Sequence, residues 1–363
     1  MRRVSSRQTY RIVVIKGDGI GPSIVEAAVG VLDAVQQRLE SFRLDIEYHE
    51  AGAEYYKRNG SNLAPETFDA IKSADAAMKG PVGLPDVRGA DGTEAGLLGG
   101  VLRTGLDAYA NVRPVRLWPG VPAPIKARPG EIDYVIVREN TEGLYLSRGK
   151  GVGTDQAYAD SMLITRKGTE RVARYAFELA RRRGGAPEDG KKRVTCVDKS
   201  NVLASFAFFR RVFDEVSEQY PDIEAEHLYA DAAAQALVMR PQHFNLLVME
   251  NFLGDILSDL GGGTAGGIGL CPSGNIGDAY AYFEPVHGSA PDIAGQDRAN
   301  PISQVLTAAL MLEHLGEPEG AELIRTAVSQ SLASGRLVID ASGQPVGGTA
   351  KAGETIAAEV SEG

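Results

Sequence analysis

The sequence of 363 residues contains only two cysteines, Cys196 and Cys271, and these lie far apart along the chain. Two such cysteines can form neither a disulfide framework nor a cysteine-based zinc site, so we expect both to be small core residues. No apolar run approaches the roughly 20 residues that a membrane-spanning helix requires. Residues 1–10 carry charge, but no apolar segment follows them. We therefore expect a cytosolic (cytoplasmic) protein with no membrane partner.

Positive charge is also scarce. The chain has 38 Lys and Arg against 48 Asp and Glu, which gives a formal net charge of -10. An acidic protein gains no free energy from contact with phosphate backbones, so we expect no nucleic-acid partner. Hydrophobic residues make up 43% and charged residues 24% of the chain, which is typical of a globular protein with a large core. At about 150 residues per domain, the length favours two domains.

The Rossmann fingerprint G-x-G-x-x-G is missing as well. The segment GDGIGP at 17–22 resembles a nucleotide-binding loop only superficially, so a Rossmann fold is not expected. Glycine itself is abundant, with 43 residues that gather at 80–105, 149–153 and 261–277. In these segments, loops must bend sharply or let a ligand approach the backbone.

Strand-like and helix-like segments alternate along the chain. The alternation of apolar residues and the turn signals predict strands at 11–16, 44–48, 74–79, 108–115, 132–138, 193–197, 223–229, 245–249 and 281–286. Helical spacing predicts helices after residue 22 and at 65–73, 167–183, 201–219 and 301–315. Helix-compatible segments also follow the predicted strands at 223–229 and 245–249. This alternation indicates an α/β fold with two α/β units. The part after residue 266 has few strands, so we expect it to fold back onto the N-terminal sheet.

Three aspartates are candidate ligands of a divalent cation. Asp255 and Asp259 are four residues apart, so they lie on one face of a helix, where their charges repel unless something binds between them. Asp231 follows a predicted strand. Three carboxylates suit an oxygen-ligated Mg²⁺ or Mn²⁺. The alternative is a solvated acidic helix face.

Other residues are candidates for proton transfer and anion binding. Lys199 follows a predicted strand, where an apolar surround would lower the pKa of its amine toward that of a base. Tyr145 offers a phenol that can donate a proton. Arginines at 103, 113 and 138 can each hold a carboxylate with two hydrogen bonds. A solvated lysine and structural ion pairs of the arginines are the alternatives.

The segment EPVHGSAPDIAGQDRANP at 284–301 leads from a strand into a turn of small residues. Backbone N–H groups and a histidine can approach an anionic or ribose-bearing ligand closely in such a turn. Asp292 would accept hydrogen bonds from ribose hydroxyls and repel a 2′-phosphate, which favours NAD over NADP.

Six segments together resemble the β-decarboxylating hydroxyacid dehydrogenases, a family of isopropylmalate, isocitrate, homoisocitrate and tartrate/D-malate dehydrogenases. In order, these segments are GDGIGP at 17–22, NVRP at 111–114, VRENTEGLY at 137–145, VDKSNVL at 197–203, GDILSDL at 254–260 and EPVHGSAPDIAG at 284–295. The resemblance implies a non-Rossmann α/β fold of two domains with the active site in the cleft between them. Residues 1–108 and 266–363 would form the cofactor-binding domain, and residues 109–265 the dimerisation and metal/substrate domain.

The resemblance also implies roles for individual residues. An NAD- and metal-dependent enzyme would oxidise and decarboxylate a 3-substituted (2R)-malate, such as 3-isopropylmalate or a close analogue. Lys199 and Tyr145 would move protons. The ligands of Mg²⁺ or Mn²⁺ would be Asp231, Asp255 and Asp259. The protein would be a homodimer with shared active sites, in which Lys199 and Asp231 act from the second copy. The substrate carboxylates would be bound by Arg103, Arg113 and Arg138. The cofactor would be bound by Ile20, Glu284, His287, Gly288, Ser289, Ala290, Asp292 and Asn300. NADP-dependent members have Lys and Tyr where Asp292 and Ile293 stand, so NAD is the expected cofactor.

The resemblance is ambiguous where the family reads the C3 substituent of its substrate. Isopropylmalate enzymes place two leucines a turn before the first arginine, whereas a direct count back from Arg103 reaches Gly99 and Gly100. A local insertion would instead restore Leu97 and Leu98. D-malate/tartrate and isocitrate/homoisocitrate dehydrogenases therefore remain alternatives. An alternative of another class is a non-catalytic regulatory subunit of such an enzyme.

Overall fold

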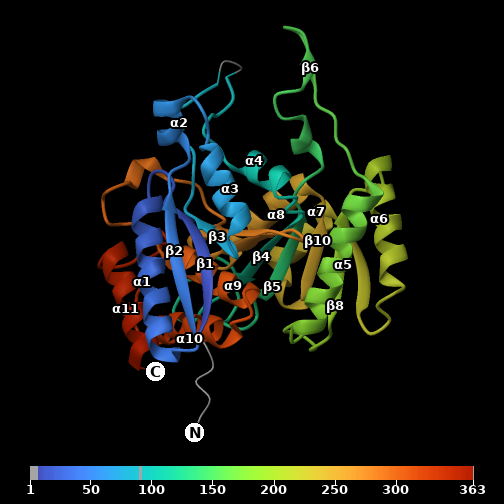
Figure 1. Ribbon diagram of the computed structural model, residues 1–363. Helices are drawn as coiled ribbons and strands as arrows, with labels where there is room; N and C mark the ends of the chain where they lie inside the picture. Colours follow the sequence, from blue (N-terminus) through green and yellow to red (C-terminus); the bar gives the residue numbers. More distant parts are fainter. Residues whose placement is uncertain (1–6, 90–91, 363) are drawn as a thin grey trace.

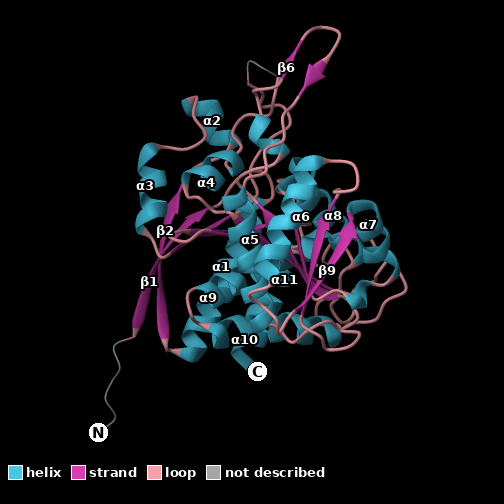
Figure 2. Ribbon diagram, turned by 90° about the vertical axis from the view of Figure 1, so that its right-hand side faces the viewer, coloured by secondary structure: helices cyan, strands magenta, loops and turns pink. Residues whose placement is uncertain are grey.

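The computed structural model describes residues 7–89 and 92–362, and a single ten-stranded sheet runs through this part of the chain (Figure 1). Helices cover both faces of the sheet (Figure 2). In chain order, the strands of this sheet are β1 (Gln8–Ile15), β2 (Phe42–His49), β3 (Ala76–Lys79), β4 (Ala110–Arg116), β5 (Asp133–Glu139), β8 (Arg193–Asp198), β9 (Glu224–Tyr229), β10 (Leu246–Met249), β11 (Pro272–Ile276) and β12 (Ala281–Pro285).

The strand order explains how the ends of the chain meet. In space the order is β2-β1-β3-β12-β11-β4-β5-β10-β8-β9. Strand β12 pairs with β3, so the C-terminal part does fold back onto the N-terminal strands, as the sequence predicts. Strands β4 and β11 lie on opposite sides of the predicted domain boundaries, and their antiparallel pairing makes the sheet continuous. The division into domains at residues 108 and 266 stays a prediction.

The helices agree with the predicted periodicity over most of the chain. They are α1 (Gly21–Leu39), α2 (Ala53–Asn59), α3 (Pro65–Ser73), α4 (Gly99–Gly105), α5 (Arg166–Arg182), α6 (Ala204–Ser217), α7 (Ala230–Met239), α8 (Asn251–Thr264), α9 (Ile302–His314), α10 (Pro318–Ala333) and α11 (Thr349–Glu362). The predictions miss α2, α4, α10, α11 and β11. They also miss a small hairpin of β6 (Val152–Gly153) and β7 (Tyr158–Ala159), which projects from the body of the molecule (Figure 2).

Burial follows the helical spacing in the sequence. The face of α1 that carries Ile24, Ala28 and Val31 is buried, and α11 packs beside this helix (Figure 1). Cys196 and Cys271 are unpaired and buried, which confirms that both are core residues. Within residues 7–89 and 92–362, no helix has the length and apolarity to cross a membrane.

Strand register at the middle of the sheet brings four polar residues into one row. Tyr282 on β12 lies opposite Asn275 on β11, and Asn275 lies opposite Asn111 on β4. Asn111 in turn lies opposite Arg138 on β5. Directly opposed residues point to the same face of a sheet. The row therefore carries polar groups across the junction between the two halves of the sheet.

Adjacent phenylalanines on α6 test the packing of this helix behind β8. Phe209 is 1% exposed, whereas Phe208 is partly exposed and lies beside Arg166 and Arg211. We expect Phe209→Ala to lower the free energy of unfolding by about 3–5 kcal/mol, because it leaves a cavity in the core. Phe208→Ala on the same helix should cost less than about 1.5 kcal/mol. Urea denaturation measures both, and equal losses would contradict the burial of Phe209.

Candidate active site

A cavity of about 820 Å³ lies where α4, the ends of β4 and β5, and the loop after β12 come together. Its size is in the range of sites for small molecules and cofactors. The charged residues that line it are Lys79, Arg103, Arg113, Arg138, Glu142, Arg148, Lys150, Asp160, Asp255 and Glu284. Cations outnumber carboxylates in this lining, which favours an anionic ligand.

Three of the lining arginines come from different elements, and two of them are buried. Arg103 lies on α4, Arg113 on β4 and Arg138 on β5, and the latter two are 6% and 1% exposed. Burial, together with the neighbouring guanidinium groups of Arg103 and Arg113, lowers the pKa of Arg138 to about 9. The Nε atom of Arg103 has no hydrogen-bond partner among the described residues. An anion in the cavity would relieve both conditions.

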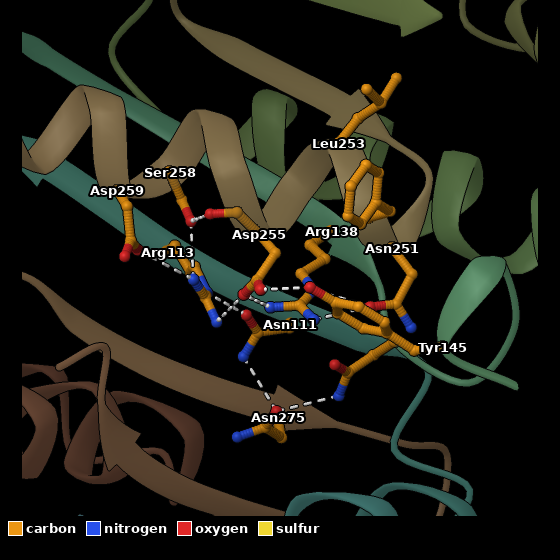
Figure 3. A network of polar contacts seen from close by, with 12 residues as sticks. Asn111, Arg113, Arg138, Tyr145, Asn251, Leu253, Asp255, Ser258, Asp259 and Asn275 are labelled. Atoms are coloured by element: carbon orange, nitrogen blue, oxygen red, sulfur yellow. Dashed lines mark hydrogen bonds and ion pairs between the residues drawn. The ribbon is translucent and has the colours of Figure 1, made fainter. Parts of the chain in front are cut away.

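Asp255 on α8 is the carboxylate that both Arg113 and Arg138 contact (Figure 3). Arg138 Nη1 donates to its Oδ1, and Arg113 Nη2 lies 3.6 Å from the same oxygen. The hydroxyl of Tyr145 donates to its Oδ2 at 2.8 Å. Burial by itself would raise the pKa of Asp255, but Arg138 and Arg113, together with the Tyr145 hydroxyl and Arg103, lower it. Asp255 is therefore an ionised carboxylate inside a cationic site.

Asp259 follows Asp255 by one helical turn on the same side of α8, as predicted (Figure 3). Its Oδ1 lies 3.6 Å from Arg113 Nη1, and its side chain is 55% exposed. Burial raises the pKa of Asp259, and Arg113 acts in the opposite direction. The two carboxylates offer oxygen donors of the kind that Mg²⁺ and Mn²⁺ prefer.

Lys199 and Asp231 lie outside the cavity. Lys199 follows β8 and Asp231 is in the first turn of α7, so both stand near the carboxyl ends of the neighbouring strands β8 and β9. Lys199 Nζ donates to Asp231 Oδ1 at 2.8 Å, and this contact lowers the pKa of Asp231. The described part of one chain contains no group of three His, Cys, Asp or Glu placed to hold a metal ion. One chain by itself thus separates the predicted third ligand and the lysine from the cavity.

Tyr145 is placed as a neutral proton donor. It belongs to a short 3₁₀ turn, η1 (Leu144–Ser147), and its ring packs edge-on against Phe252. Burial and the hydrogen bond to Asp255 raise the pKa of its phenol. A raised pKa keeps the proton on the hydroxyl over a wider pH range, so Tyr145 stays protonated near neutral pH.

Three of the predicted cofactor residues line the cavity: Glu284, His287 and Gly288. Burial lowers the pKa of His287, so its imidazole is neutral near pH 7. Its Nδ1 contacts the carbonyl of Gly288 at 3.0 Å, and its Nε2 has no partner among the described residues. A polar ligand such as a dinucleotide fits this unpaired nitrogen.

The other predicted cofactor residues lie beyond the cavity lining. Ile20 N donates to the carbonyl of Ser289 at 2.8 Å, which joins the GDGIGP loop to the loop after β12. Ala290 packs against Ile20, whereas Asn300 is buried and donates to the carbonyl of Gly343 at 3.1 Å. Asp292 is exposed. The structure brings the two loops together, and the ribose role of Asp292 stays a prediction.

Two groups in the site were missed by sequence reasoning. Lys79, at the end of the apolar strand β3, is 3% exposed and forms an ion pair with Glu284. Burial by itself would raise the pKa of Glu284, but Lys79 and Arg103 lower it to about 2. The sequence did contain a signal for Lys79, because this lysine directly precedes the glycine-rich segment at 80–105. Asn275 was missed because β11, with the sequence PSGNI, lacks the residues that favour strands.

The cavity lining also shows which of the four residues at 97–100, just before Arg103, face the cavity. Gly99, Gly100 and Leu97 line the cavity, whereas Leu98 is fully buried in the core. A Cβ atom added to Gly100 would meet no heavy atom within 4 Å. The first turn of α4 therefore leaves open space beside Arg103.

Comparisons with known proteins agree with this geometry. The sequence pattern of the isocitrate/isopropylmalate dehydrogenase family matches residues 11–356. A 3-isopropylmalate/3-methylmalate dehydrogenase from Methanocaldococcus jannaschii is 44% identical over 336 residues, which are 92% of this chain and 94% of that protein. A 3-isopropylmalate dehydrogenase from Bifidobacterium longum is 43% identical over 332 residues, 90% of this chain and 93% of that protein.

Solved structures show the same similarity. The crystal structure of an isocitrate dehydrogenase from Methylococcus capsulatus has a TM-score of 0.85 and 39% sequence identity, and the match covers 97% of this chain and 100% of the other. A β-decarboxylating dehydrogenase from Thermococcus kodakarensis has a TM-score of 0.78 and 38% identity, over 97% and 96% of the two chains.

The buried pair of Lys79 and Glu284 predicts a pH-dependent contribution to stability. The folded pKa of Glu284, about 2, is below the value of about 4.3 for an unfolded chain. The ionised carboxylate therefore stabilises the fold above about pH 4.3, and this contribution is lost as the pH falls toward 2. We expect Glu284→Gln to cost on the order of 3 kcal/mol at pH 7 and progressively less between pH 4.3 and 2.5.

Denaturant unfolding of both proteins across this pH range measures the difference. Glu26→Gln, on an exposed position of α1, serves as the control and should show little difference at any pH. A cost of Glu284→Gln that does not change with pH would refute the lowered pKa.

Proposed function

Because this chain belongs to the isocitrate/isopropylmalate dehydrogenase family, we propose that it oxidises and decarboxylates a 3-substituted (2R)-malate, with NAD and a divalent cation. We propose 3-isopropylmalate or a close analogue as the substrate. The observation that carries this proposal is one cavity lined by three arginines, in which Arg113 and Arg138 contact Asp255 and Tyr145 donates to the same carboxylate. A hydroxy diacid has the two carboxylates and the transferable protons that this set of groups can serve.

The arginines bind and orient the diacid. Arg103 has an unsatisfied Nε, so it can take a carboxylate without giving up a hydrogen bond through that atom. Arg113 and Arg138 line the same cavity and already contact Asp255. Their burial strengthens each contact with an anion, because water does not compete for it.

The residues present fit the two groups that this reaction needs. Asp255 and Asp259, with Asp231 of a second copy, would hold Mg²⁺ or Mn²⁺. The loops around Ile20 and the residues from Glu284 to Asn300 would hold NAD, with Asp292 at the ribose. When bound, the cation stabilises negative charge on the substrate oxygens and NAD accepts a hydride.

Two side chains move protons in this proposal. Tyr145 keeps its proton near neutral pH because of its raised pKa, and it donates that proton to C3 after CO₂ leaves. Asp255 orients the phenol through the hydrogen bond of 2.8 Å. Lys199 of a second copy removes the proton of the substrate hydroxyl.

A homodimer with shared sites is part of this proposal. Lys199 and Asp231 have side chains that are 30% and 72% exposed, so both are accessible to another chain. Large apolar side chains are exposed too: Val202 and Leu203 shortly after Lys199, Met239 at the end of α7 and Ile256 on α8. A surface of this kind is typical of a protein–protein interface.

The second candidate function is that of an isocitrate or homoisocitrate dehydrogenase. A Cβ atom at Gly100 would meet no heavy atom within 4 Å, so a C3 substituent larger than isopropyl would find space there. Isocitrate and homoisocitrate carry such substituents. A non-catalytic regulatory subunit is disfavoured, because the candidate catalytic and ligand side chains are all retained in the sequence.

A substrate panel tests the function. With Mn²⁺ and either NAD or NADP, we expect kcat/KM to be highest for NAD with a 3-substituted malate, among (2R)-malate, D-tartrate, 3-isopropylmalate, isocitrate and homoisocitrate. The expected reason is that the open first turn of α4 accommodates a C3 substituent. NADH formation measures the rate, and no turnover with any acid would contradict an enzymatic role.

A variant of Gly100 shows whether the substituent lies beside α4. Gly100→Leu should lower kcat/KM for the bulkiest good substrate at least about tenfold more than for (2R)-malate, because the leucine fills that space. Gly30→Leu, at an open and exposed glycine of α1, should leave this ratio unchanged. Equal effects on all acids would place the substituent elsewhere.

Mixed dimers test the sharing of active sites. Lys199→Ala and Tyr145→Phe should each abolish most turnover, because each removes one of the two proton-transfer groups. In a mixture, half of the dimers combine the two variants, and one of their two sites is intact, so about a quarter of wild-type activity should return.

The control for this experiment is a mixture of Lys199→Ala with Asp231→Ala. Both residues would come from the same donating chain, so each site in the mixed dimer still lacks one of them and no activity should return. Activity measured after co-refolding distinguishes the cases. Failure of the first mixture to recover activity would show that Lys199 does not act in trans.

A further inference from the structure

Asn275 is a buried amide at the centre of the polar row across the sheet. It is 0% exposed, and its Oδ1 accepts hydrogen bonds from the Nδ2 atoms of Asn111 and Asn140, each at 2.9 Å (Figure 3). Its Nδ2 donates to Glu284 Oε1 at 3.0 Å. Asn275 itself does not line the cavity, so any effect on ligands must pass through its neighbours.

Arg113 and Glu284, at the two ends of this chain of hydrogen bonds, determine which atom donates and which accepts in each bond between them. Arg113 has only donors, and its Nε donates to Asn111 Oδ1. Asn111 must then present its Nδ2 to Asn275, which leaves the Nδ2 of Asn275 for Glu284. Glu284 is ionised and has only acceptors. Asn111 and Asn275 therefore each have one orientation that satisfies these charged neighbours.

Both oxygens of Glu284 are held in this way. Lys79 forms an ion pair with Oε2, and Asn275 donates to Oε1. The two donors come from β3 and β11, which flank β12 on either side. A carboxylate that is fixed at both oxygens has a defined orientation toward the cavity.

We propose that Asn275 is a positioning residue that aligns Glu284, at the cofactor end of the cavity, with Arg113 at the substrate end. On the side of Arg113, Asn111 makes the connection, because it donates to Asn275 and accepts from Arg113. This inference rests on the proposed function, since it takes NAD and a hydroxy diacid as the ligands of the two ends. Buried amides in the middle of a sheet cost desolvation free energy that apolar side chains would avoid. The presence of Asn111 and Asn275 here is explained if they orient the charged groups of Arg113 and Glu284.

Two substitutions separate the two links. Asn275→Asp keeps an oxygen for Asn111 and Asn140 but replaces the donor to Glu284 with a repelling oxygen. We expect the Kd of NADH to rise about tenfold, as for a lost hydrogen bond to a charged group. The Kd of (2R)-malate should rise clearly less. Asn275→Leu removes both links, so the affinities for NADH and for (2R)-malate should both fall at least about fivefold.

NADH fluorescence gives the first Kd, and the thermal shift that (2R)-malate produces in the NAD-free protein gives the second. Asn245→Asp is the matched control, since Asn245 is also 0% exposed and its Oδ1 accepts a hydrogen bond from the backbone N–H of Arg193, away from the cavity. It should leave both affinities unchanged. If a variant merely reduced the fraction of folded protein, the apparent kcat would fall but neither Kd would change, so the two Kd values distinguish a folding defect from a positioning role.

The outcomes distinguish this inference from the proposed function. If the wild-type protein binds NADH but both Asn275 variants bind it equally well, the inference alone is overturned. Equal losses in the Asn245 control, or a greater effect of Asn275→Asp on (2R)-malate than on NADH, would also overturn it. A wild-type protein that binds no NADH contradicts the proposed function as well. If Asn275→Asp does not fold, Asn275→Leu still decides, because it adds no charge.

Discussion

The electrostatic balance around Asp255 is the constraint on which the rest of the site depends. Burying Arg113 and Arg138 removes two cations from water, which is costly unless anions and hydrogen bonds compensate. Asp255 and Asp259 lie near these two guanidinium groups, and Arg103 adds a third guanidinium to the same cavity. The lining of the cavity thus holds more cations than carboxylates. In the proposed function, such a preorganised site would stabilise the diacid and the negative charge that develops on it.

The sheet explains how this balance is held in place. Arg113 and Arg138 lie on the antiparallel strands β4 and β5, and the helix α8 carries Asp255 across them. Glycine is required where α8 crosses, because a Cβ at Gly254 would lie 2.6 Å from the side chain of Arg138. The arginines are therefore fixed by strand register and by close packing of a helix, rather than by flexible loops. A rigid support of this kind keeps the donors aligned before the ligand arrives.

The ends of the chain contribute the other wall of the cavity. Lys79 comes from β3 and Glu284 from β12, and these strands are neighbours only because the C-terminal part returns to the N-terminal sheet. Strand β11 then joins this half to β4 through Asn275 and Asn111. The residues proposed for the cofactor and those proposed for the substrate are thus connected through hydrogen bonds between buried amides, and the connection crosses the predicted domain boundary.

The sequence by itself determined the alternation of strands and helices, the helical face shared by Asp255 and Asp259, and the family to which the chain belongs, because local periodicity and short motifs record these features. It also indicated the three arginines, but not that two of them, Arg113 and Arg138, contact one carboxylate. Only the tertiary structure decided that Gly99 and Gly100, rather than Leu98, face the cavity, and that Lys199 and Asp231 lie outside it. It alone revealed Lys79 and Asn275. The pairing of β3 with β12 and of β4 with β11 joins residues more than 150 positions apart, and a contact over that separation leaves no local pattern in the sequence.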